Sequence, residues 1–148
     1  MIELIEKNIK LFVPDKFSGF KLDDLLNTRK YHSQCKSCDF WLSNDNIDLF
    51  IECKSPNEVD KSTLDKLIRE AICQLRCSHF VANTKNVHFY LFIVIPKKWA
   101  LWVSSLVMKF STAEREIAKI PVNVCIDIED FDSVLKKIDS KISVGYKK

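Results

Sequence analysis

The central feature of the sequence is a pair of apolar runs separated by a polar turn, between residues 37 and 55. Aromatic and aliphatic residues at positions 40–42 precede Asn44-Asp45-Asn46, whose side chains favour turns. In the second run, apolar positions 47, 49, 51 and 53 alternate with positions 48, 50, 52 and 54. This alternation predicts a β-hairpin whose second strand turns one face to the core.

Helical and strand patterns flank this hairpin. Apolar residues at helical spacing predict helices over residues 2–12, 20–30, 60–78 and 100–119, and a final helix with an apolar stripe from Phe131 to Ile142. Apolar runs at 87–95 and 122–128 predict strands, and residues 145–148 are expected to be frayed. A strand–helix–strand order with a crossover of about 30 residues is typical of a βαβ unit. We therefore expect an α/β protein with helices on both faces of a sheet.

Length and composition indicate one domain over residues 1–148, long enough to bury a sizeable core. No apolar run approaches the roughly 20 residues needed to span a bilayer. Glu3 and Glu6 near the N-terminus are not typical of a signal peptide. We expect an intracellular, cytoplasmic protein without a membrane partner.

Charge, cysteine and glycine content narrow the function classes. A net charge of +3 and a pI near 8.5 are compatible with nucleic acid as a partner. The six cysteines are expected to be reduced inside a cell. With only two glycines, the chain has no Gly-rich phosphate loop, which argues against nucleoside triphosphate and dinucleotide cofactors.

The candidate chemistry lies at the end of the predicted hairpin. Glu52 and Lys54 point the same way from the second strand, and the hairpin can bring Asp39 beside Glu52. Two carboxylates at a strand end can hold a hard divalent cation, and a lysine beside them can orient a water or stabilise charge on a phosphate. Asp48 lies about 13 Å from Glu52 along the strand, so we do not expect it to share the ion.

These residues also carry a family resemblance. Cys38-Asp39 followed by Glu52-Cys53-Lys54 resembles the motif of the PD-(D/E)xK nuclease superfamily, which includes many restriction endonucleases and the archaeal Holliday-junction resolvases. Cys38 stands where the superfamily has a proline that does no chemistry. The resemblance covers most of the chain in pattern, but in residues only the stretch 39–74. It implies a restriction-endonuclease-like core, in which helices flank both faces of a mixed central β-sheet.

The resemblance also implies a function: a nuclease that uses Mg²⁺ or Mn²⁺ to hydrolyse phosphodiester bonds in duplex or branched DNA. Asp39 and Glu52 would bind the metal with the backbone carbonyl of Cys53, and Lys54 would position or activate the attacking water. Glu6 would be a further, weaker metal ligand, because the first helix of superfamily members often lends a glutamate. Gln74 would contact the substrate or a metal-bound water, with a plain surface glutamine as the alternative.

Two groups of basic residues are expected to contact the phosphate backbone. They are Arg29, Lys30 and Lys36 before the hairpin, and Lys97 and Lys98 next to Trp99. The expected partner is DNA, with RNA left open. A homodimer is expected because the symmetric cleavage of two strands needs two sites.

A different class of function is left open by the same residues. The chain could be a non-catalytic module on the same fold that binds nucleic acid or protein. Four cysteines could then hold a metal, although their spacing follows no zinc-finger pattern. The remaining interpretation is that they are ordinary thiols; the four are Cys35, Cys38, Cys73 and Cys77.

Overall fold

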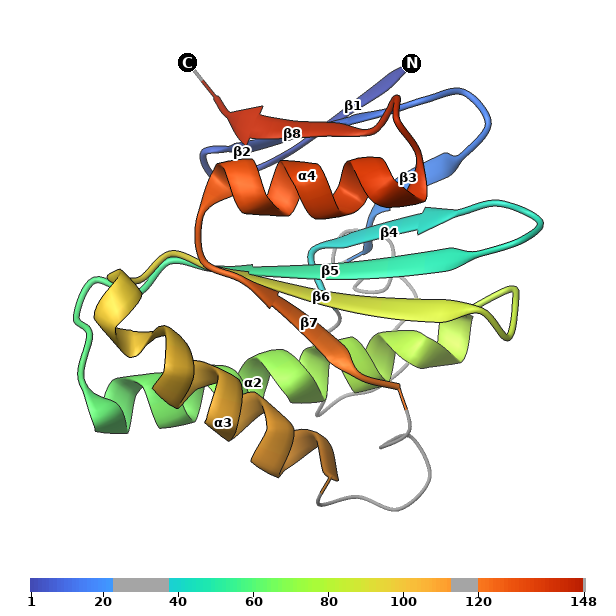
Figure 1. The fold of residues 1–148 in the computed structure, drawn as a ribbon. Coiled ribbons are helices and arrows are strands. Elements are labelled where there is room, and N and C mark those ends of the chain that lie inside the picture. The colour runs from blue at the N-terminus through green and yellow to red at the C-terminus, as the bar shows by residue number, and fades with distance from the viewer. Residues whose placement is uncertain (23–37, 113–119, 148) are drawn as a thin grey trace.

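The computed structural model describes residues 1–22, 38–112 and 120–147 (Figure 1). A five-stranded sheet has the strand order β3-β4-β5-β6-β7, and a three-stranded sheet has the order β1-β2-β8. The strands are β1 (Ile2–Glu6), β2 (Ile9–Val13), β3 (Ser18–Lys21), β4 (Phe40–Ser43), β5 (Asp48–Lys54), β6 (Val87–Ile93), β7 (Val122–Cys125) and β8 (Ser143–Tyr146). The helices of the described ranges are α2 (Lys61–Ser78), α3 (Ala100–Thr112) and α4 (Ile128–Ile138), with short 3₁₀ turns η1 (His79–Val81) and η2 (Lys97–Trp99).

The elements form layers around the larger sheet. Strand β4 pairs antiparallel with both β3 and β5, whereas β6 pairs parallel with both β5 and β7. Helices α2 and α3 lie on one face of this sheet, and α4 with the three-stranded sheet lies on the other (Figure 1). The expectation of an α/β protein with a mixed sheet and helices on both faces is therefore confirmed.

The central hairpin is also confirmed. Strands β4 and β5 pair in the register Phe40 to Ile51 and Ser43 to Asp48. The side chain of Asn44 closes the turn by accepting hydrogen bonds from the backbone N–H groups of Asn46 and Ile47 at 2.8 and 3.0 Å. However, both faces of β5 are covered and not only one, because α2 packs on the face opposite the main hydrophobic cluster.

The predicted first helix is wrong: residues 2–13 form the hairpin β1–β2. Ile2, Ile5, Ile9 and Phe12 have helical spacing, but Ile9, Leu11 and Val13 also alternate, and in the structure these three are buried. Short apolar segments fit both periods. The segment folds as a strand because β2 also pairs with β8, and this pairing buries the apolar face of β2 in the core.

The C-terminal tail is the second correction. Of the residues predicted to be frayed, Gly145 and Tyr146 belong to β8, which pairs antiparallel with β2. The last helix ends at Ile138, so that Ile142 is buried beyond the helix. A long-range pairing between the two ends of the chain is not visible in local sequence pattern, which explains the error.

Other boundaries differ from the prediction by two or three residues: β6 ends at Ile93 and not at 95, and β7 ends at Cys125 and not at 128, where α4 begins. Asp60 caps α2 by accepting a hydrogen bond from the backbone N–H of Thr63 at 2.8 Å, as expected of an N-cap. Of the predicted helix 20–30, residues 20 and 21 belong to β3, Leu22 is helical, and residues 23–30 lie outside the described residues. The structure describes α3 as far as Thr112. Within the described ranges, no helix has the length and apolarity needed to cross a membrane.

Candidate active site

Glu52 and Lys54 project from the end of β5 toward α2. Phe50, two residues earlier on the same face, packs in one cluster with Leu75 of α2. The ammonium of Lys54 lies 3.5 Å from a carboxylate oxygen of Glu70, also on α2. Glu52, between them on the strand, is only 1% exposed. The strand and the helix therefore enclose a carboxylate next to a lysine, as the sequence predicted.

Asp39 completes the carboxylate pair from the neighbouring strand. Its Oδ2 accepts a hydrogen bond from the backbone N–H of Cys53 at 2.8 Å. The register of β4 and β5, extended by one residue, puts Asp39 opposite Glu52. Because the N–H and C=O of one strand residue point to the same side, the Cys53 carbonyl also points toward Asp39. Asp39, Glu52 and this carbonyl therefore converge on one end of the hairpin.

Helix α2 anchors the segment that carries Asp39. The hydroxyl of Ser78 accepts a hydrogen bond from the backbone N–H of Cys38 at 2.8 Å and donates one to the carbonyl of Gln74 at 2.7 Å. The carbonyl of Asp39 accepts a hydrogen bond from the N–H of Leu22 at 3.1 Å. The aspartate is thus held by backbone contacts on both sides, which suits a group that must keep its position.

The pKa of the Cys53 thiol reports the electrostatics of the site. Burial is the largest cause that raises its pKa well above the ordinary value of 9.0, followed by the negative charges of Asp39, Glu52 and Glu6. The thiol therefore stays protonated at neutral pH and is a poor metal ligand. The same shift indicates that negative charge gathers at this end of β5, where a cation would be attracted.

Gln74 is buried and not a surface residue. It is 8% exposed, and its Oε1 has no hydrogen-bond partner among the described residues. On α2 it lies one turn from Glu70, which contacts Lys54, and one turn from Ser78, which contacts Cys38. Gln74 therefore lies on α2 between the residue that contacts Lys54 and the residue that contacts Cys38, the neighbours of the two carboxylates. A buried oxygen without a partner costs about 1–3 kcal/mol, so this position calls for an explanation.

Glu6, the predicted weaker metal ligand, lies near the end of β5, where it and Lys54 line the same hollow. It ends β1 and forms an ion pair with Lys21 at 3.4 Å, and the hollow, of about 10 Å³, is also lined by Cys53 and Phe92. Cys53 and Phe92 belong to the cluster on the face of the sheet opposite α2. Glu6 contributes negative charge near Cys53 from behind the strand.

Asp48 has a structural role at the other end of β5. Its side chain is fully buried, and its two oxygens accept hydrogen bonds at 2.7–3.0 Å. The donors are the indole of Trp41, the hydroxyls of Ser43 and Thr84, and the backbone N–H groups of Asn83 and Thr84. These bonds fasten the loop after η1 to the hairpin, and they use the carboxylate fully.

Only one of the two basic groups predicted to contact the phosphate backbone of DNA lies in the described part of the chain. Lys97 and Lys98 form the exposed turn η2 at the carboxyl end of β6. In parallel α/β sheets, ligands bind beyond this end of the strands, and Lys54 also lies there. Arg29, Lys30 and Lys36 lie outside the described residues.

The cysteines do not form a metal site in the described part of the chain. Cys77 is disulfide-bonded, which corrects the expectation that all six thiols are reduced. Cys38, Cys53, Cys73 and Cys125 are thiols, and Cys35 lies outside the described residues. No group of three or more histidine, cysteine, aspartate or glutamate side chains that could hold a metal ion occurs there. Any cation at the hairpin would use two carboxylates, a backbone carbonyl and water.

Glu70 is the site residue that sequence reasoning missed. It lies four positions before Gln74, so the two share a flank of α2, and that spacing was the available signal. Comparisons of the chain with protein-family models, curated proteins and solved structures find no match.

Proposed function

We propose that the protein is a divalent-metal-dependent nuclease that hydrolyses phosphodiester bonds in DNA. The observation that carries the proposal is the convergence of Asp39, Glu52 and the Cys53 carbonyl at one end of the hairpin. Lys54 lies on the same strand face as Glu52. Carboxylate and carbonyl oxygens are the donors that Mg²⁺ and Mn²⁺ prefer, so the residues fit such an ion. This arrangement agrees with a restriction-endonuclease-like core.

Each residue then has a role that follows from its contacts. Asp39, Glu52 and the Cys53 carbonyl would hold the ion, which when bound supplies a Lewis acid that stabilises charge on the scissile phosphate. Lys54 orients the attacking water and adds positive charge beside the phosphate. Glu70 is a positioning residue that directs the lysine. The Oε1 of Gln74 accepts a hydrogen bond from this water or from the substrate, which accounts for a buried acceptor without a protein partner.

The proposal predicts cleavage that depends on added metal. Purified protein should cut at least one substrate among supercoiled plasmid, linear duplex, four-way junction and single-stranded DNA with Mg²⁺ or Mn²⁺, and none with EDTA. Gel analysis of the products reports the reaction, and matched RNA substrates test the alternative partner.

The plasmid product also reports on subunit organisation. Two sites in a homodimer should convert supercoiled plasmid directly to the linear form, whereas a single site should accumulate nicked circles. If no substrate is cut with either metal, the proposal fails in favour of a non-catalytic binding module.

Gln74 offers a test that separates function from folding. Gln74→Leu removes an unpaired buried oxygen and keeps the approximate size of the side chain, so we expect the melting temperature to stay equal or to rise. Cleavage should fall roughly 10-fold or more, the usual cost of losing a group that orients a metal site. Calorimetry and initial cleavage rates measure the two effects. A variant that cuts as fast as wild type would remove Gln74 from the site.

A further inference from the structure

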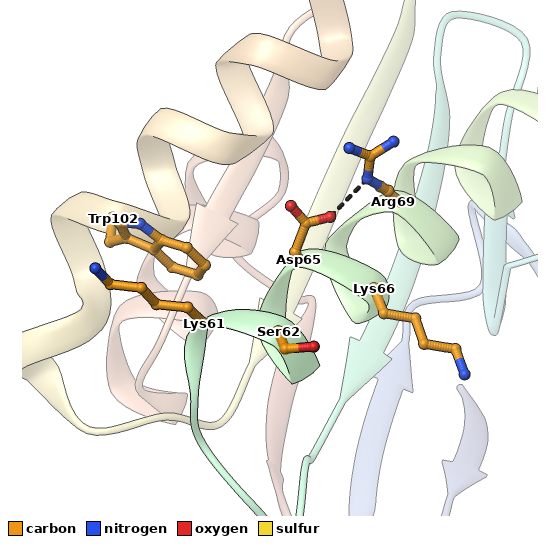
Figure 2. Close-up of a pocket in the computed structure, with 6 residues that line it drawn as sticks. All are labelled: Lys61, Ser62, Asp65, Lys66, Arg69 and Trp102. Atoms are coloured by element: carbon orange, nitrogen blue, oxygen red, sulfur yellow. Dashed lines mark hydrogen bonds and ion pairs between the residues drawn. The ribbon is translucent and has the colours of Figure 1, made fainter.

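A second candidate site lies on the outer surface of the layer formed by α2 and α3. An open hollow of about 510 Å³ lies where the first turns of α2 meet α3. Figure 2 shows the lining residues of α2, of which Lys61 lies beside the indole that α3 contributes and Lys66 extends away from it. The lining residues are Lys61, Ser62, Asp65, Lys66, Arg69 and Trp102.

The charge of the hollow favours an anion. The lining has three cationic side chains and one carboxylate, that of Asp65. The carboxylate already accepts a hydrogen bond at 2.6 Å from Nε of Arg69, whose guanidinium also lies 4.3 Å from the centre of the Phe110 ring. These two contacts orient Arg69, and the lysines reach into solvent. A phosphate would therefore meet one oriented cation and two adaptable ones.

The indole adds a stacking surface. Trp102 is half-buried, and it meets the ring of Trp99 edge-on, with 5.6 Å between ring centres. This contact and the neighbouring core fix the plane of the ring. Figure 2 shows Lys61 alongside it. Trp99 directly follows Lys97 and Lys98 in η2, so further exposed cations lie beyond the aromatic pair.

We propose that this hollow binds a segment of single-stranded nucleic acid. Its phosphates would contact Lys61, Lys66 and Arg69, and one base would stack on Trp102, the combination by which proteins hold single strands. A paired duplex cannot offer the face of a base to an indole, because its bases are stacked on each other. The segment would then continue over Lys97 and Lys98.

The hollow is separate from the candidate active site. Asp65 and Arg69 line the side of α2 that faces α3, whereas Glu70 and Gln74 lie on the flank toward β5, and Lys66, one turn before Glu70, is the lining residue nearest to that flank. The inference rests on the proposed function only for nucleic acid as the ligand class. It adds that the substrate carries a single-stranded part beside the bond that is cut.

Binding in EDTA tests the hollow without any cleavage. Fluorescence anisotropy should show tighter binding of a labelled 12-nucleotide oligothymidylate than of a duplex of equal length, and competition by dTMP should exceed that by inorganic phosphate. Trp102→Leu should weaken oligothymidylate binding roughly 10-fold, the usual scale for losing one stacked base. Lys61→Glu with Lys66→Glu should weaken it at least as much and flatten the salt dependence.

The matched control is Lys85→Glu with Lys137→Glu, which makes the same charge change at two exposed lysines outside the hollow. If this control weakens binding as much as the hollow variants do, only net charge matters and the site is refuted. Displacement by polyglutamate as effective as by oligothymidylate would also overturn it. Because metal is absent, failure of the nuclease proposal leaves these results unchanged.

Discussion

Glu52→Gln, Asp39→Asn and Lys54→Met should each reduce metal-dependent cleavage by at least about 100-fold, with the fold preserved. Each change nearly keeps the shape of the side chain and removes only its charge. Glu52 and Asp39 would lose a metal-binding oxygen, and Lys54 would lose the ammonium that faces the water. Initial rates over a Mg²⁺ titration measure the effect, and added metal should partly rescue a carboxylate variant if affinity is what was lost.

The matched control is Asp45→Asn, which makes the same chemical change at the exposed turn of the same hairpin. It should cleave at the wild-type rate. Glu70→Gln should slow cleavage less than Lys54→Met, because it releases the lysine without removing it. If Asp39→Asn and Glu52→Gln cut as well as Asp45→Asn, the hairpin end is not the catalytic site.

Asp48→Ala should destabilise the protein by about 3–5 kcal/mol, a loss in the range known for breaking a buried polar network. The substitution removes the buried carboxylate that accepts hydrogen bonds from Trp41, Ser43, Asn83 and Thr84, and these donors lose that partner inside the protein. The melting temperature should fall by roughly 10 °C or more for a chain of this size. Urea denaturation followed by tryptophan fluorescence measures the change.

Two comparisons separate this effect from catalysis. Asp45→Ala, at the exposed turn, should change stability by less than about 0.5 kcal/mol. Below its melting temperature, the folded Asp48→Ala variant should still cleave DNA, because position 48 lies at the opposite end of β5 from Glu52. A melting temperature equal to that of wild type would show that the carboxylate network does not hold the loop after η1.

The sequence predicted the hairpin correctly because a hairpin depends on local features. The Asn44 turn, the alternation along β5 and the Asp60 cap are each encoded within a few residues. A hairpin also fixes which residues face each other, so the pairing of Asp39 with Glu52 followed from the turn alone.

Only the tertiary structure decided the features that depend on residues far apart in the chain. The first segment is a strand because β2 pairs with β8, more than 130 residues away, and a short apolar pattern fits helix and strand equally. Likewise, Gln74 is buried and Glu70 reaches Lys54 because α2 packs against β5, and Asp48 is structural because a loop 35 residues later donates to it. Local sequence specifies which side of a strand or helix a residue occupies; packing decides what covers that side.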